Sequence, residues 1–121
     1  MGDSMRFHTL NIHYSFPEPA WRLIADAYAT LPGWLGFGAG GRGDPGIPYW
    51  FGTEDDERFI WASVEPGGLQ IGARMPDSDW DRWFAKAKAA FSEALEYDVG
   101  EPEEGALFPS EWPVDEDTEW W

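Results

Sequence analysis

The stretch DSDWDRWFAKAKAAFSEALEYD, residues 77–98, has the clearest periodicity in the chain. Its large apolar side chains recur at steps of three and four residues, which places them on one face of a helix that packs on a core. They are Trp80, Phe84, Ala87, Phe91 and Leu95, and Trp83 and Ala94 widen the same stripe. Ser78 and Asp81 have the spacing of a capping box, and Gly100 follows the stretch. The pattern predicts an amphipathic helix over 77–98 that organises the fold.

The chain before this helix begins with patterns typical of a strand and a first helix. Residues 5–14 alternate between two faces, as in a strand. Ser15, with Glu18 three residues later, predicts the start of a helix, and Pro32 with Gly33 predicts its end. The buried stripe expected on this helix is Trp21, Ile24, Tyr28 and Leu31.

The middle of the chain combines a glycine-rich segment with three short strand patterns. Residues 33–48 read GWLGFGAGGRGDPGIP, and their seven glycines predict a long loop. Strands are predicted over 49–51, 59–64 and 69–75, with the acidic turn GTEDDE before the second of them. The last two strands are expected to form a hairpin whose turn is EPGG, residues 65–68.

Taken in order, the predicted elements are β-α-β-β-β-α. This order predicts an α+β fold, a two-layer sandwich in which a mostly antiparallel sheet of about four strands carries two helices on one face. With 121 residues the chain is expected to form a single domain over 1–100, followed by an acidic C-terminal extension over 101–121 that contains Pro and Trp. Apolar side chains predict that part of this segment packs on the domain or on a partner; they are Leu107, Phe108, Trp112, Val114, Trp120 and Trp121.

The charge of the chain restricts the classes of partner. Against 23 Asp and Glu residues there are 8 Lys and Arg residues, which gives a net charge of −15. Because nucleic-acid binding requires a basic face, the composition argues against direct nucleic-acid binding and favours a basic protein partner. The sequence has no cysteine, no apolar run long enough to span a membrane and no secretory pattern at its start, which together predict a cytoplasmic protein.

Several patterns that could carry chemistry lack the context that the chemistry needs. The G-x-G-x-x-G pattern at 38–43 is followed by DPGIP, which cannot start the helix that a phosphate site requires. The alternating aspartates of DSDWD are not followed by the glycine and glutamate of a calcium loop. His8 and His13 fall on opposite faces of the predicted strand, and no cysteine nucleophile or nucleophile elbow is present. We therefore predict no catalytic residue, no cofactor and no metal site.

Two clusters of acidic residues are the candidate partner-binding surfaces. The first combines Asp44 with Glu54, Asp55, Asp56 and Glu57, and its expected aromatic anchors are Trp34 and Trp50. The second follows the end of the 77–98 helix and contains Glu93, Glu96, Glu101, Glu103 and Glu104. The carboxyl end of a helix disfavours acids by about 0.3–1 kcal/mol each, so local stability does not account for this second cluster.

A small, strongly acidic and aromatic-rich chain without catalytic groups resembles the bacterial immunity proteins that bind and block a toxin encoded beside them. The resemblance covers the size, the charge and the order of elements of the whole chain. It implies that an acidic face occludes the basic substrate groove of a toxin, such as a nuclease, with aromatic side chains supplying the buried contacts. The choice between a monomer and a homodimer stays open.

Two further classes of function remain open. A DNA-mimicking inhibitor, or another acidic module that binds a protein, would use the same charges with its carboxylates spaced like phosphates. A small-ligand-binding protein or an enzyme would use the 33–48 loop as a cleft, flanked by Trp34, Phe37, Tyr49 and Trp50. A pocket lined by these rings and holding a carboxylate of perturbed pKa would favour the second of these classes.

Overall fold

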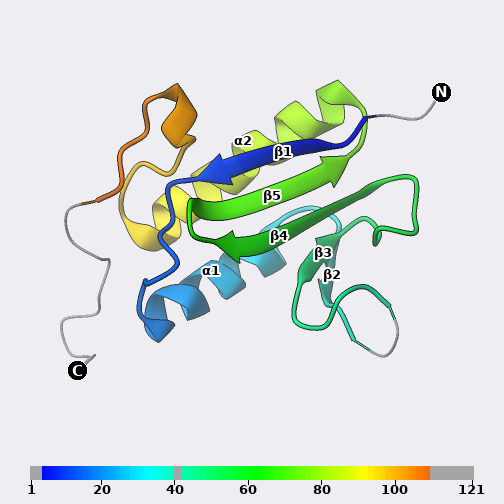
Figure 1. Cartoon of the computed structure of the whole chain (residues 1–121), viewed down its shortest axis with the longest axis horizontal. Coiled ribbons are helices and arrows are strands. Elements are labelled where there is room, and N and C mark those ends of the chain that lie inside the picture. The colour runs from blue at the N-terminus through cyan, green and yellow to red at the C-terminus, as the bar shows by residue number, and fades with distance from the viewer. Residues whose placement is uncertain (1–3, 40–41, 110–121) are drawn as a thin grey trace.

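The computed structural model describes residues 4–39 and 42–109. Within them the chain forms a five-stranded antiparallel sheet and two long helices (Figure 1). The strands are β1 (Arg6–Leu10), β2 (Trp34–Phe37), β3 (Pro48–Trp50), β4 (Phe59–Glu65) and β5 (Gly68–Arg74). The helices are α1 (Glu18–Thr30), α2 (Asp77–Leu95) and the short 3-10 helix η1 (Pro102–Glu104). The strand order is β1-β5-β4-β3-β2, so β1 and β2 form the two edges of the sheet.

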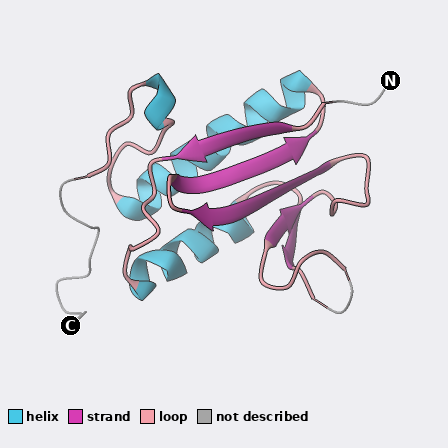
Figure 2. Cartoon of the chain, in the orientation of Figure 1, coloured by secondary structure: helices cyan, strands magenta, loops and turns pink. Residues whose placement is uncertain are grey.

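The predicted α+β sandwich is confirmed. Both α1 and α2 pack on the same face of the sheet, and no helix of the described residues covers the opposite face (Figure 2). The hairpin of β4 and β5 is also confirmed, with Glu65 paired to Gly68 across a two-residue turn. Neither long helix in the described part of the chain is apolar enough over a sufficient length to cross a membrane.

The sheet has one strand more than expected because the glycine-rich segment 33–48 is not a loop throughout. Its first residues form β2, in which Trp34 pairs with Trp50 of β3. The register shifts between Trp34 and Gly36, and Gly36 has a φ of 98°, a conformation that a side chain would disfavour. The glycine therefore permits a bulged edge strand, whereas the composition had predicted a loop.

Strand β1 is shorter than predicted and ends at Leu10 instead of residue 14. The cause is a change of backbone partner after the paired stretch with β5. The Asn11 N–H donates to the carbonyl of Gly100 at 2.9 Å, and the Ile12 N–H donates back to the carbonyl of Leu10 at 2.8 Å. The chain thus leaves the sheet directly after Leu10, the last residue of β1 that pairs with β5.

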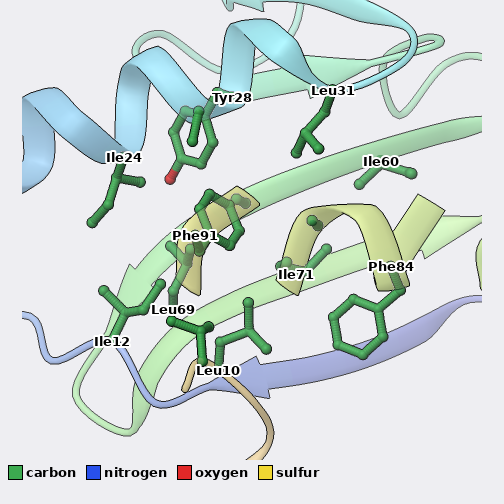
Figure 3. Close-up of a cluster of buried hydrophobic side chains, with 14 of the residues drawn as sticks. Leu10, Ile12, Ile24, Tyr28, Leu31, Ile60, Leu69, Ile71, Phe84 and Phe91 are labelled. Carbon is green, nitrogen blue, oxygen red and sulfur yellow. The ribbon is translucent and has the colours of Figure 1, made fainter. Parts of the chain in front are cut away.

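The core lies between the sheet and the two helices, as the periodicity of α2 predicted. Its stripe residues from Trp80 to Leu95 are buried except Ala94, which is half-buried, and Leu69, Ile71 and Ala73 of β5 point into the same layer. Figure 3 shows Tyr28 of α1 against Phe91 of α2 above the strand residues, and these two rings meet edge to face at 5.7 Å. Burial of each large apolar side chain in such a layer stabilises the fold by about 1.5–3 kcal/mol.

The predicted helix caps are wrong. Helix α1 begins at Glu18 after Pro17, α2 begins at Asp77 after Pro76, and neither helix has a side-chain cap. Proline fixes φ near −65°, which leads the chain into a first turn without a capping hydroxyl. Ser15 Oγ instead lies 2.6 Å from Nδ1 of His13. Helix α2 ends at Leu95, short of the predicted residue 98, because Glu96 adopts a left-handed conformation with a φ of 60°.

Candidate functional site

The two predicted acidic surfaces lie at opposite ends of α2 (Figure 1). We call Glu54, Asp55, Asp56 and Glu57 the acidic loop, and Glu93, Glu96, Asp98, Glu103 and Glu104 the acidic end. Arg58, which directly follows the acidic loop, approaches Asp79 in the first turn of α2 at 3.6 Å. The acidic end follows the last turn, and a helix of 19 residues is about 28 Å long. The two surfaces are therefore separate candidate sites.

The acidic loop uses part of its charge to hold its own conformation. Tyr49 donates its hydroxyl hydrogen to Glu54 Oε1 at 2.7 Å, and the Thr53 N–H donates to Asp56 Oδ2 at 2.8 Å. The Asp44 N–H donates to the Tyr49 hydroxyl at 2.8 Å, so the structure brings Asp44 beside the loop as predicted. Asp55 and Glu57 are exposed, and no ion pair of the described residues involves them.

The Tyr49 hydroxyl remains a hydrogen-bond donor at neutral pH. Burial raises the pKa of Tyr49 to about 12, against the opposing effect of the hydrogen bond from Asp44, and the carboxylate of Glu54 raises it further. A protonated phenol can donate to Glu54 while accepting from the backbone. Tyr49 thus ties the glycine-rich segment to the acidic loop.

Neither aromatic anchor predicted for this surface is fully exposed, and the prediction is wrong for Trp50. Trp50 is fully buried, and its indole N–H donates to the carbonyl of Tyr28 at 3.1 Å. Trp34 is half-buried and packs on Trp50 with ring centroids 5.2 Å apart. Both side chains turn toward the helix layer because Trp50 pairs with Ile60 on the buried face of β4. Trp50 is thus inaccessible to a partner, and Trp34 contributes mainly to the core.

The acidic end differs from the loop in having almost no compensating charge. Its five carboxylates are exposed, and none of them joins an ion pair within residues 4–39 and 42–109. Glu101, predicted to belong to this surface, is instead mostly buried, and its Oε2 lies 2.9 Å from Nδ1 of His8. His8 stacks on Trp80 with ring centroids 5.0 Å apart. Glu101 is therefore a structural contact, and Glu103 and Glu104 are the accessible acids of η1.

A buried asparagine holds the segment that carries the acidic end. The Asn11 side-chain amide donates to the carbonyls of Asp98 at 3.1 Å and Leu107 at 2.6 Å, and its oxygen accepts the Gly100 N–H at 2.9 Å. The Tyr97 hydroxyl donates to the carbonyl of Asn11 at 2.8 Å. Residues 97–107 are thus fastened to the end of β1 in one conformation, with η1 between the fixed points.

Apolar side chains lie beside the acidic end and were not predicted as anchors. Leu107 is 83% exposed, Phe108 38% and Tyr14 56%. The ring of Phe108 meets His13 edge to face at 6.0 Å, and His13 stacks on Tyr14 at 4.5 Å, so these side chains form one patch. We call Tyr14, Leu107 and Phe108 the apolar patch. Its sequence signal was the excess of apolar residues in an acidic segment; Trp112, Val114, Trp120 and Trp121 lie outside the described residues.

The remaining candidate patterns form ion pairs and ordinary contacts. Asp77 forms an ion pair with Arg6. Asp79 forms ion pairs with Arg58 and Arg82. Two of the three alternating aspartates at the start of α2 are therefore engaged by arginine side chains. No group of three or more His, Asp or Glu side chains in the described part of the chain could hold a metal ion. The G-x-G-x-x-G pattern leads into β3 and not into a helix.

The glycine-rich segment borders a cleft, but its lining differs from the one that the small-ligand alternative would use. A cleft of about 170 Å³ lies beside β2, and it is lined by Phe37 and Tyr49 but not by Trp34 or Trp50. The two tryptophans face the helix layer instead. Compared with models of protein families, with curated proteins and with solved structures, the chain matches none.

Proposed function

We propose that this protein binds a basic protein partner through the acidic end and the adjoining apolar patch. We further propose that the partner is a toxin whose basic active-site groove is covered in the complex, as in an immunity protein. The observation that carries the proposal is the uncompensated charge of the acidic end, at the carboxyl terminus of α2.

The region around the acidic end carries negative charge and no positively charged side chain that follows Lys88 in the sequence. No Lys, Arg or His follows Lys88 in the sequence, whereas six acids of the described residues follow it, from Glu93 to Glu104. The last carbonyls of α2 add the negative end of the helix dipole to the same region. Such a concentrated field attracts a basic partner over a distance and accelerates encounter.

The acidic loop is a weaker candidate for the same role. Glu54 and Asp56 accept hydrogen bonds from within the loop. Arg58 follows the loop directly and pairs with α2, where Arg82 also pairs. These arginines offset part of the negative charge at that end of the molecule, so a basic partner gains less there.

The apolar patch offers large side chains that a partner can bury, which charge alone does not provide. Interfaces derive most of their affinity from a few large side chains that become buried, while the surrounding charges set encounter rate and specificity. Tyr14, Leu107 and Phe108 are large and exposed. Leu107 and Phe108 follow η1 on the segment that Asn11 holds, and Tyr14 joins Phe108 through the ring of His13. They are the proposed anchors in place of Trp50, which is fully buried, and Trp34, which is half-buried.

Affinity capture from a lysate of the source organism tests this proposal. Two tagged variants each lose two exposed charges: Glu103→Gln with Glu104→Gln at the acidic end, and Asp55→Asn with Glu57→Gln in the acidic loop. We expect the wild type and the loop variant to retain one basic protein that salt elutes, and the acidic-end variant to lose it. Coexpression with that protein should then suppress its toxicity. Equal capture by both variants, or a captured protein that is not basic, contradicts the proposal.

A further inference from the structure

Two adjacent aromatic rings lie on the face of the sheet opposite α1 and α2. Because side chains alternate along a strand, Phe7 points away from the helix layer, in which its neighbour His8 stacks on α2. Trp61 likewise alternates with the buried Ile60. The register places Phe7 of β1, Gly72 of β5 and Trp61 of β4 in one row, and the two ring centroids are 6.0 Å apart. An antiparallel sheet usually turns polar side chains to water on its open face, so this pair of rings indicates a contact surface.

Gly72 is the residue that lets the two rings come together. A Cβ at Gly72 would approach Cζ2 of Trp61 to 2.3 Å, so the indole ring occupies the space that a side chain here would fill. Gly72 is itself buried, whereas Phe7 is 58% exposed and Trp61 is half-buried. The ring pair is therefore supported by the sheet on one side and open to solvent on the other.

The next row on the same face supplies hydrogen-bonding groups that the fold does not use. Thr9 of β1, Gln70 of β5 and Ser63 of β4 pair in register, two residues along each strand from the rings. The Ser63 hydroxyl donates to Glu65 Oε1 at 2.9 Å. Within residues 4–39 and 42–109, neither the hydroxyl of Thr9 nor the side-chain amide of Gln70 forms a hydrogen bond. A hydroxyl and an amide can both donate to and accept from a polar ligand.

The charges around the ring pair favour a neutral ligand. On β1, β5 and β4 the open face carries one base, Arg74, and one acid, Glu65. The guanidinium of Arg74 lies 5.2 Å from the ring centre of Phe59, one row from the ring pair. An anionic ligand is repelled by the chain as a whole, whose net charge is −15, and a cationic ligand is repelled by Arg74. A neutral ligand avoids both repulsions.

The size of the exposed ring surface favours a small molecule over a second copy of the chain. A Phe or Trp side chain buries about 150–250 Å² when it is fully covered, so the exposed parts of Phe7 and Trp61 offer about 200 Å² together. A stable protein interface needs about 800 Å² from each partner. The planes of the two rings are inclined at 58°, so one flat ligand cannot lie on both, whereas two linked rings can each contact one.

We propose that the open face of the sheet binds a neutral saccharide, with one sugar ring on Trp61 and the next against Phe7. A pyranose ring presents C–H groups on its faces and hydroxyls at its rim. The negative face of an aromatic ring attracts such C–H groups, and the rim hydroxyls reach the side chains of Gln70 and Thr9. The site shares no residue with the acidic end or the apolar patch and does not depend on the function proposed for them.

Titration of the ¹⁵N-labelled protein with cellobiose at constant ionic strength, followed by amide chemical shifts, tests the proposal. Cellobiose should bind with a dissociation constant of about 1–20 mM, because an open face covers only one side of the ligand. The shifts should concentrate at residues 7, 9, 61, 63, 70 and 72 and at the indole N–H of Trp61. Methyl glucoside, which has one ring, should bind at least about threefold more weakly. Glucuronate and glucosamine, its anionic and cationic counterparts, should bind more weakly still.

Two variants and a control test the ring pair itself. Phe7→Ala, at an exposed side chain, should weaken cellobiose binding at least about threefold, and Trp61→Ala should abolish it while thermal unfolding stays cooperative. Tyr14→Ala, at an exposed ring of the apolar patch, should leave it unchanged.

Four results would overturn the proposal. They are the absence of cellobiose-induced shifts on the open face, unchanged binding by Phe7→Ala, and binding of glucuronate or glucosamine as tight as that of methyl glucoside. The fourth is a dimer in sedimentation velocity that Phe7→Ala dissociates, since a second copy of the chain would then occupy this face.

Discussion

Asn11 shows how much of the acidic end depends on a single buried side chain. It is completely buried, and its amide forms three hydrogen bonds with the backbone of residues 98, 100 and 107. These use both N–H groups and the oxygen of the amide, which no other side chain of similar size can reproduce. Asn11 is therefore a positioning residue for η1 and for the apolar patch.

We expect Asn11→Ala to lower the free energy of unfolding by about 2–4 kcal/mol, because it leaves buried backbone groups unpaired. Urea unfolding measures the loss. Thr9→Ala, nearby in β1 on the open face of the sheet, should change it by less than about 0.5 kcal/mol. A comparably small effect of Asn11→Ala would show that residues 98–107 are held in some other way.

The role of Asn11 could not be predicted from the sequence, whereas the buried stripe of α2 could. Helical and strand periodicity depend on neighbours within a few residues, and these predicted Trp80, Phe84 and Phe91 as core residues. The partners of Asn11 lie 87 to 96 residues further along the chain. Trp50 was misplaced for the same reason, since its burial depends on pairing with β4 and packing under α1.

Two features at the carboxyl end of α2 are expected to destabilise the helix: a strained backbone conformation and acidic side chains. Glu96 has a φ of 60°, a conformation that glycine adopts without the steric cost of a Cβ. Glu93 and Glu96 also lie where the helix dipole disfavours negative charge. A helix end selected only for stability would carry glycine and basic residues here.

We expect Glu96→Gly to raise the free energy of unfolding by about 1 kcal/mol, since it relieves both the left-handed strain and the charge repulsion. Glu93→Gln, a change of charge within the helix, should raise it by about 0.3–1 kcal/mol. Urea unfolding of the two variants separates the two contributions. A decrease in either variant would mean that these acids stabilise the fold, which would remove the argument that they serve binding.

The existence of the elements was more predictable than their ends. Both long helices and the β4–β5 hairpin followed from local periodicity and turn residues. Strand β2 was missed because Gly36 within it, and Gly33 and Gly38 beside it, disfavour a strand locally, and pairing with β3 stabilises it. The capping predictions at Ser15 and Ser78 failed because Pro17 and Pro76 start the helices without a side-chain hydrogen bond.

At the scale of the whole molecule, α2 separates two acidic surfaces of different character. The acidic loop lies near arginines and uses two of its carboxylates for its own hydrogen bonds. The acidic end carries exposed carboxylates beside the apolar patch, and none of them forms an ion pair within the described part of the chain. The composition predicted that acidic surfaces would matter, but only the placement of the arginines distinguishes the two.

The association rate constant of the captured partner distinguishes binding at the acidic end from binding at the acidic loop. It should be measured by stopped flow at low ionic strength for the wild type, for Glu103→Gln with Glu104→Gln, and for Asp55→Asn with Glu57→Gln. We expect the acidic-end variant to associate about tenfold more slowly and the loop variant to stay within about twofold of the wild type. Slower association of the loop variant alone, or equal rates for all three proteins, would contradict this expectation.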